Sequence, residues 1–166
     1  VKDSAMSRQG IPDYFVTMRK PGVNDERVEG LLEYFAGDTW EDEAAFNRAC
    51  RDAYESQASY NPQRESHMTF EQFRSIFIWQ RYASPVWMDI NPSDTLQKES
   101  AREHDDERHI CPLQLQVIDR CIELWTNPGE VVFSPFGGIG SEGYVALRSG
   151  RKFVGMELKE SYWIQA

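Results

Sequence analysis

The most informative pattern of apolar and polar positions lies in the last third of the chain. Residues 130–134 centre on Val-Val-Phe and predict a short buried strand. A glycine-rich turn follows, and a helix is predicted over residues 141–149 with Ser141 as its N-cap. Residues 152–156 predict a second strand. A strand, a helix and a strand in this order predict a βαβ unit with parallel strands.

Apolar residues at the spacing of an amphipathic helix also recur before this unit. The predicted helices cover residues 25–36, 41–57, 69–79 with Thr69 as N-cap, and 112–126, where Pro112 takes the first helical position. A further helix is expected after Lys159.

Two other segments favour extended structure. Residues 13–19 are rich in β-branched and aromatic side chains and predict a strand, and residues 86–90 predict a short strand or an extended segment. The expected organisation is a strand-containing lead-in over 1–22, a helical, acidic segment over 23–83, and an α/β segment over 84–166.

Length and composition are those of a soluble globular protein with one domain. The chain has 166 residues, 40% of them hydrophobic, and no apolar run near the roughly 18 residues that a membrane helix needs. The N-terminus has no signal-peptide pattern, so we expect a cytoplasmic protein. Cys50, Cys111 and Cys121 are an odd number without C-x-x-C spacing, which predicts reduced thiols rather than a disulfide framework.

The net charge of −9 does not favour a nucleic-acid partner, because phosphate contacts need Lys and Arg. The excess is local, however. Residues 23–66 hold eleven acids and four arginines, whereas the other 122 residues hold 16 acids and 14 bases. A basic surface can therefore coexist with an acidic segment, and the net charge does not exclude DNA binding.

The turn after the first predicted strand carries the spacing G-x-G-x-x-G at Gly138, Gly140 and Gly143. Glycine has no Cβ, so a backbone with this pattern can pass close under a nucleotide-like ligand. Glu157 ends the second predicted strand, where an acid can accept hydrogen bonds from ribose hydroxyls. These features predict a nucleoside-cofactor site, and the alternative is a tight turn with a purely structural role.

Three segments resemble motifs of the DNA amino-methyltransferases that use S-adenosylmethionine. Phe133-Ser-Pro-Phe-Gly-Gly-Ile-Gly140 resembles the motif D-P-F-x-G-x-G, and Gly150-Arg-Lys-Phe-Val-Gly-Met-Glu157, followed by Tyr162, is similar to G-R-x-F-x-G-x-E…Y. His109-Ile-Cys-Pro112 with Leu115 resembles H-P-x-x-K-P-x-x-L. Residues 13–20 look like the late strand of the catalytic half. This order, with the cofactor motifs at the C-terminal end, is that of the β-class enzymes.

The resemblance implies part of an α/β, Rossmann-like S-adenosylmethionine-dependent methyltransferase fold, with a small helical insertion or target-recognition segment over 23–80. It implies S-adenosylmethionine as the cofactor and adenine N6 or cytosine N4 as the methylated atom, in the setting of restriction–modification. DNA is the implied partner, contacted by residues 23–108, and the target base would be flipped out of the duplex.

The resemblance assigns three groups of residues to the cofactor. The glycine loop would hold it through Phe133, Ser134, Pro135, Phe136, Gly137, Gly138, Ile139 and Gly140. Glu157 would accept hydrogen bonds from the ribose hydroxyls. The methionine end would be bound by His109, Cys111, Pro112 and Leu113.

Three features depart from the family pattern. Ser134 replaces the usual Asp, which weakens or rearranges one cofactor hydrogen bond, and the usual Lys of the upstream segment is absent. The catalytic tetrapeptide (D, N or S)-P-P-(Y, F or W) is missing, and Asn91-Pro-Ser-Asp94 is the nearest string. The catalytic residues are therefore unassigned. We expect the chain to be a piece of a larger protein, with the motif upstream of Val1, and a missing N-terminal catalytic part or a homodimer partner completing the site.

Two other functions fit the same residues. The glycine spacing also occurs in NAD(P)- or FAD-binding oxidoreductases, although that fingerprint usually opens a domain with further strands after it. The missing tetrapeptide favours a non-catalytic cofactor- or DNA-binding module, such as a truncated phage or prophage product. We expect no metal site, because His104, His109 and Cys111 match no common zinc spacing.

Overall fold

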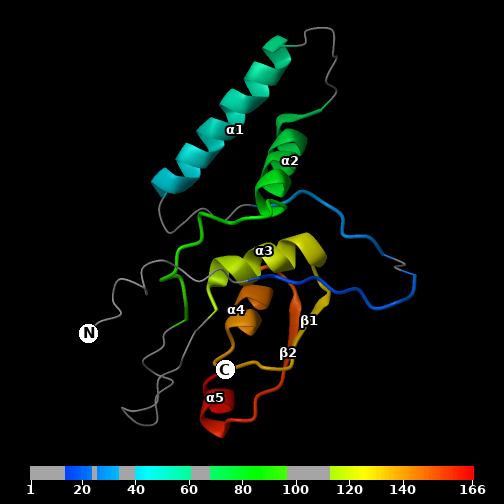
Figure 1. Ribbon diagram of the computed structural model, residues 1–166, viewed down its shortest axis with the longest axis vertical. Coiled ribbons are helices and arrows are strands. Elements are labelled where there is room, and N and C mark those ends of the chain that lie inside the picture. The colour runs from blue at the N-terminus through cyan, green and yellow to red at the C-terminus, as the bar shows by residue number, and fades with distance from the viewer. Residues whose placement is uncertain (1–13, 24–25, 34–39, 61–67, 97–112) are drawn as a thin grey trace.

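A computed structural model describes residues 14–23, 26–33, 40–60, 68–96 and 113–166 of the protein. Within these ranges the elements follow the order α1, α2, α3, β1, α4, β2, α5 (Figure 1). The helices α1 and α2 form one part of the molecule, and the elements from α3 onward form the other (Figure 1). In the described ranges, no helix has both the length and the apolar character that crossing a membrane requires.

The predicted βαβ unit is confirmed. β1 (Val131–Ser134) and β2 (Lys152–Gly155) pair in parallel with Val132 opposite Phe153, and α4 (Ser141–Arg148) connects them. α3 (Leu115–Trp125) packs on α4. The core between these elements contains Leu115, Ile118, Ile122, Val145 and Ala146, with Val132 and Phe153 packed against it. This core supports the glycine turn that follows β1.

The described residues leave the other face of this sheet uncovered. Side chains alternate between the two faces of a strand, so Val131, Phe133 and Val154 lie on the face opposite Val132 and Phe153. They are 57%, 55% and 52% exposed. Parallel sheets are usually buried on both faces. Two strands and one covered face are only part of a Rossmann-like sheet, so the complete methyltransferase fold stays a prediction.

Two of the predicted helices are confirmed as α1 (Trp40–Tyr60) and α2 (Phe70–Tyr82). Thr69 is the N-cap of α2 as predicted. Its hydroxyl accepts a hydrogen bond from the Gln72 N–H at 3.2 Å, and the Gln72 side chain accepts one from the Thr69 N–H at 3.0 Å, which is a capping box. The core between this helical pair and α3 contains Phe46, Ile78 and Tyr82, with Leu32, Phe77 and Leu124 packed against it.

The helix predicted over residues 25–36 is wrong for the part that the structure describes. Residues 26–33, called the strap below, are not helical, and Gly30 has a φ of 107°, outside the helical region. Asn127 and Ser75, which lie on other parts of the fold, hydrogen bond to the backbone of the strap. These tertiary bonds satisfy backbone groups that a helix would pair internally, and they override the periodicity.

The strand predicted over residues 13–19 is absent from residues 14–19, and Asp13 lies outside the described residues. Tyr14, Val16 and Met18 are exposed, and in the described part of the chain β1 and β2 pair only with each other. A strand needs a neighbour for its N–H and C=O groups, and residues 14–19 have none here. Residues 86–90 are extended without strand pairing.

Two predicted helix starts are also wrong by one to three residues. α3 begins at Leu115 rather than at Pro112, which lies outside the described residues, because the Leu115 N–H already bonds to the Asp94 carbonyl at 2.8 Å. Ser141 is the first residue of α4 and not its cap. The N-cap is Gly140, whose φ of 88° suits a residue without a Cβ. α5 (Glu160–Gln165) follows Lys159 as predicted.

Candidate cofactor site

The glycine turn is tied to the end of β2 by backbone hydrogen bonds. The Met156 N–H donates to the Ser134 carbonyl at 2.9 Å, and the Gly137 N–H donates to the Met156 carbonyl at 2.7 Å. A Cβ on Gly137 would lie 3.3 Å from that carbonyl oxygen. The first glycine therefore allows the turn to pass close to β2 and extends the parallel pairing beyond the strands.

The next part of the turn needs glycine for its backbone conformation. Gly138 and Gly140 have φ values of 53° and 88°, in the left-handed region. A Cβ on Gly140 would lie 3.1 Å from the Cβ of Ala166, whereas a Cβ on Gly138 would meet nothing within 4 Å. Gly138 thus presents open backbone at the turn, where a ligand can approach closely.

Glu157 lies directly at this turn. Its Oε2 accepts a hydrogen bond from the Gly138 N–H at 2.8 Å, and its Oε1 accepts one from the Lys159 N–H at 2.8 Å. The structure therefore brings together two motif residues that are 19 positions apart. The sequence predicts only a contact of this carboxylate with a ligand. The structure shows that it also holds the backbone of the loop at Gly138.

Gly143, the last glycine of the spacing, seats α4 on β2. A Cβ at this position would lie 2.8 Å from the Phe153 ring, and a Cβ on Gly155 would lie 2.7 Å from the same ring. The Phe153 side chain thus fills the space that two glycines leave open. This close approach of helix and strand positions the N-terminal turn of α4 beside the loop.

The other predicted loop residues divide between core and solvent. Ser134 and Ile139 are buried, whereas Phe133 and Pro135 are exposed and Phe136 is 83% exposed. Buried Ser134 and Ile139 stabilise the loop, and exposed Phe136 is available for contact with a ligand or with another polypeptide.

The predicted methionine-end segment is described only in part. Leu113 is exposed, and His109, Cys111 and Pro112 lie outside the described residues. Sequence reasoning missed the carbonyl of Met156 and the N–H of Lys159, which shape the site through backbone groups. No residue type marks such groups, and only the motif that surrounds them could have indicated the positions.

The string nearest to the catalytic tetrapeptide has a local structural role. The Asn91 side chain accepts a hydrogen bond from the Ser93 N–H at 3.0 Å, and the Asp94 N–H donates to the Asn91 carbonyl at 3.2 Å. The Asn91 N–H donates to Gln116 of α3 at 2.7 Å. These contacts make residues 91–94 a turn docked on α3, and they give no support to a catalytic function.

Among the described residues, no group of His, Cys, Asp and Glu side chains could hold a metal ion, and His104, His109 and Cys111 lie outside them. Cys50 and Cys121 are free thiols, and burial raises the pKa of both, that of Cys121 to about 11. Raised pKa values disfavour the thiolate, so these two cysteines have the character of core residues.

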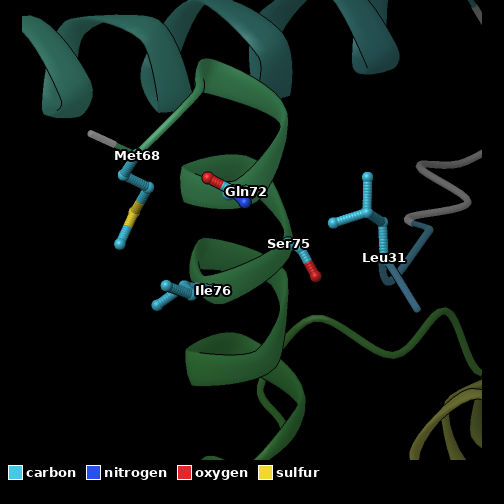
Figure 2. Close-up of a pocket in the computed structure, with 5 residues that line it drawn as sticks. All are labelled: Leu31, Met68, Gln72, Ser75 and Ile76. Atoms are coloured by element: carbon cyan, nitrogen blue, oxygen red, sulfur yellow. The ribbon is translucent and has the colours of Figure 1, made fainter. Parts of the chain in front are cut away.

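Two hollows in the described part of the molecule lie beside α2, away from the glycine turn. One of about 510 Å³ is lined by Leu31 of the strap and by Met68, Gln72, Ser75 and Ile76 (Figure 2). Another, of about 680 Å³, lies between the strap, α2 and the C-terminal ends of α3 and α4. Neither is lined by a residue of the glycine loop or by Glu157, so these two hollows do not mark the candidate cofactor site.

Comparison with known proteins identifies the family. A family model described as DNA methylase matches residues 13–166. The chain belongs to this DNA methylase family. Membership favours the methyltransferase interpretation of the glycine turn over the oxidoreductase interpretation, and it agrees with the resemblance of the motifs.

Curated relatives match the sequence of this chain over shorter stretches. The Type II methyltransferase M.BamHI of Bacillus amyloliquefaciens is 39% identical over 75 residues, which cover 45% of this chain and 16% of the relative. The putative methylase YubD of Escherichia coli (strain K12) is 41% identical over 61 residues, 37% of this chain and 25% of the relative. The DNA adenine methyltransferase YhdJ of the same organism is 39% identical over 56 residues, 34% and 19% of the two chains.

The chain spans a quarter or less of the length of these relatives. No solved structure matches it.

The geometry of the glycine loop is compatible with a nucleoside ligand. Gly138 offers open backbone, and the carboxylate of Glu157 lies beside it. A carboxylate has about four acceptor positions, so ribose hydroxyls can donate to the same group that receives the loop N–H. The residues present are therefore compatible with the ribose of S-adenosylmethionine.

Proposed function

We propose that this chain is the S-adenosylmethionine-binding part of a DNA amino-methyltransferase that modifies adenine N6 or cytosine N4. The observation that carries the proposal is the contact of Glu157 with Gly138 in a chain of the DNA methylase family. A carboxylate fixed beside an open glycine backbone is suited to a ribose with two vicinal hydroxyls.

Each group of residues has a separate task in this proposal. Glu157 accepts hydrogen bonds from the ribose, the loop of residues 133–140 supports the cofactor with its backbone, and residues 109–113 bind the methionine end. S-adenosylmethionine supplies a methyl group on a sulfonium, and the protein orients it toward an amino group of the flipped base. The residues that hold that base are not assigned in this chain.

The proposed enzyme acts on DNA and is cytoplasmic, and its DNA contacts come from residues 23–108. The acidic excess of residues 23–66 places the expected phosphate contacts elsewhere within that range. Within that range Arg81 is already paired with Asp89, so it is a poor candidate for a phosphate contact.

Calorimetric titration with S-adenosylmethionine, S-adenosylhomocysteine and NAD tests the cofactor. We expect the first two to bind, and binding of NAD alone would reject the proposal. Glu157→Gln should weaken S-adenosylhomocysteine by about 1–3 kcal/mol, because charge-assisted hydrogen bonds to the ribose are lost. The exposed Glu160 provides the matched control, and Glu160→Gln should leave the affinity unchanged.

A methylation assay distinguishes an enzyme from a binding module. Transfer of the labelled methyl group to DNA by the chain alone would show that it contains its own catalytic residues. Binding of S-adenosylmethionine without transfer would favour the non-catalytic module or a chain that needs a catalytic partner.

We further propose that the uncovered face of the sheet packs against the polypeptide that supplies the catalytic tetrapeptide. Phe133 and Val154 are about half exposed on this face, and parallel sheets are normally covered on both sides. In co-expression with such a polypeptide, Phe133→Asp should abolish co-elution in size-exclusion chromatography. Leu147→Asp, at an exposed position on α4, is the control. Self-association of the chain through Phe133 would instead identify a second copy as the partner.

A further inference from the structure

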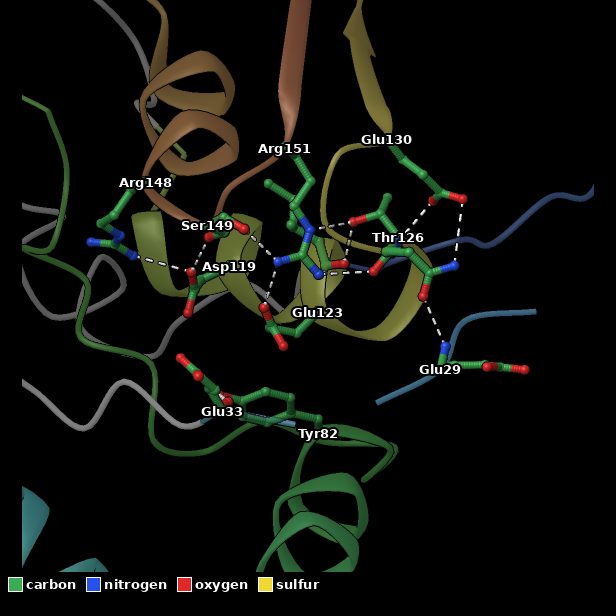
Figure 3. Close-up of polar contacts among 12 residues, drawn as sticks. Glu29, Glu33, Tyr82, Asp119, Glu123, Thr126, Glu130, Arg148, Ser149 and Arg151 are labelled. Atoms are coloured by element: carbon green, nitrogen blue, oxygen red, sulfur yellow. Dashed lines mark hydrogen bonds and ion pairs between the residues drawn. The ribbon is translucent and has the colours of Figure 1, made fainter. Parts of the chain in front are cut away.

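Arg151 is a buried cation at the end of the sheet far from the glycine turn. Its side chain is 6% exposed and comes directly before β2. The guanidinium donates to Glu123 Oε1 at 3.0 Å, to Thr126 Oγ1 at 3.1 Å and to the Thr126 carbonyl at 2.8 Å. It also donates to the Ser149 carbonyl at 2.6 Å. Figure 3 shows these side chains converging from α3 and from the turn after α4.

The two carbonyls that Arg151 binds belong to helix ends. Thr126 is the C-cap of α3, and Ser149 is the C-cap of α4. The last carbonyls of a helix lack intrahelical partners and carry partial negative charge, so a cation is favourable there. One planar guanidinium with five N–H donors can bind the C-terminal ends of both helices and Glu123 at the same time. A lysine ammonium cannot reproduce this geometry.

This contact point fixes where β2 begins. β1 and β2 share only four residue pairs, so few ladder bonds define their register. Near Arg151 the Lys152 N–H donates to the Glu130 carbonyl at 2.8 Å, and the Gly129 N–H donates to the Gly150 carbonyl at 2.9 Å. A slip of one residue would move everything along β2 by roughly 3.3 Å and turn its side chains to the other face. Glu157 would then lose its contact with Gly138.

We propose that Arg151 is a positioning residue for the cofactor site. It clamps the start of β2 to the C-terminal ends of α3 and α4, and this sets the register that brings Glu157 to the Gly138 N–H. The effect on ligand affinity rests on the proposed function, whereas the contact between Glu157 and Gly138 exists in the protein without a ligand.

The neighbouring ion pair provides a matched control. Arg148 of α4 binds Asp119 of α3 at 3.1 Å, a contact that joins the two helices (Figure 3). Arg151→Lys and Arg148→Lys are therefore the same chemical change at the same end of the fold. Only Arg151→Lys removes the guanidinium that holds the start of β2.

Amide hydrogen exchange of the ligand-free protein, followed by NMR, tests the proposal. In Arg151→Lys the Gly138 amide should exchange about tenfold or more faster relative to the Val145 amide in the core of α4. In Arg148→Lys this ratio should stay at the wild-type value. If exchange of both amides were unchanged in Arg151→Lys, Arg151 would have no role at the site. If both amides exchanged faster by the same factor, its role would be one of global stability. Either outcome would overturn the proposal.

Thr126→Val is the second variant if Arg151→Lys fails to fold. It removes one acceptor of the guanidinium and leaves the Thr126 carbonyl in place, so it should raise the Gly138 exchange ratio in the same direction by a smaller factor. A Thr126→Val protein with the wild-type ratio would then overturn the proposal.

The affinity for S-adenosylhomocysteine provides an independent test, because general destabilisation would not produce the expected pattern of losses in a double-mutant cycle. Arg151→Lys should weaken S-adenosylhomocysteine in the wild-type background and have little further effect in Glu157→Gln, because both changes act through the same carboxylate. Additive losses would overturn the proposal. If the wild-type chain binds neither S-adenosylmethionine nor its product, the proposed function fails, but the exchange experiment still decides the role of Arg151.

Discussion

Asp89 joins the two parts of the molecule at the scale of single residues. Arg81 at the end of α2 and Arg120 of α3 both donate to its carboxylate, with distances from 2.6 to 3.0 Å. The Arg120 guanidinium also lies 5.1 Å from the ring centre of Tyr82 and 5.2 Å from that of Trp87. Burial raises the pKa of Asp89, but the hydrogen bonds and charges of the two arginines outweigh it and lower the pKa to about 2.

Asp89→Asn should destabilise the protein at neutral pH by about 1–2 kcal/mol, less than full linkage predicts because the carboxylate is partly exposed. The folded pKa lies below the unfolded value of about 3.9, so this stabilisation is present above about pH 4. It is lost as the pH falls toward 2. Urea unfolding of both proteins at pH 7 and at about pH 2.5 measures the difference. A difference of the same size at both pH values would contradict the ionic explanation.

The sequence predicts site residues whose role follows from local spacing. Gly138, Gly140 and Glu157 are recognisable because each lies in a short motif, and the structure brings the first and last of these to within 2.8 Å. Asp89 and Arg151 are not recognisable in this way. Their partners lie on other elements, up to 31 residues away in sequence, and only the folded chain brings them together.

At the scale of elements, the seat of α4 on β2 depends on Gly143. A glycine inside a helix usually costs about 1 kcal/mol relative to alanine, so Gly143→Ala would stabilise an isolated helix. Here the new Cβ would lie 2.8 Å from the Phe153 ring. We therefore expect Gly143→Ala to destabilise the protein by about 1–3 kcal/mol through overpacking.

Thermal unfolding of Gly143→Ala and of Gly143→Ala with Phe153→Leu measures this effect. The smaller leucine should restore part of the lost stability, because it leaves room for the added methyl group. A rise in melting temperature for Gly143→Ala alone would show that the contact between α4 and β2 is looser than described.

Elements are predictable where their own periodicity decides the structure. α1 and α2 follow from apolar spacing and, for α2, from the N-cap Thr69, and the βαβ unit follows from its order of patterns. The strap has helical spacing too, yet it contains Gly30 in a left-handed conformation and is bound by side chains from two other elements. Tertiary contacts determine the structure of the strap, so a local sequence pattern cannot predict it.

At the scale of the whole molecule, the strap connects the helical pair to the βαβ unit. Asn127, in the turn between α3 and β1, accepts a hydrogen bond from the Glu29 N–H at 2.8 Å and donates one to the Arg27 carbonyl at 2.8 Å. The carboxylate of Glu130 accepts a hydrogen bond from the Asn127 N–H at 2.8 Å, which holds the turn itself. On the other side, the Leu32 N–H donates to Ser75 of α2 at 2.9 Å.

Asn127→Ala should therefore loosen the contact between the two parts of the molecule. The variant loses two hydrogen bonds to the strap backbone, each with a net value of about 0.5–1.5 kcal/mol, so the free energy of unfolding should fall by about 1–3 kcal/mol. Amide hydrogen exchange at Glu29 should become faster, because its N–H loses its acceptor. Exchange at Val145, in the core of the βαβ unit, should change less than exchange at Glu29.

Asn47→Ala is the matched control, since Asn47 accepts a hydrogen bond from Arg74 between α1 and α2 and does not bind the strap. It should lower stability without selectively exposing the Glu29 amide. If both variants raised Glu29 exchange by the same factor, the strap would be held by the fold in general and not by Asn127. If only Asn127→Ala does so, the Asn127 side chain binds the backbone of a segment 98 residues away in sequence. This contact then determines how the helical pair packs against the βαβ unit.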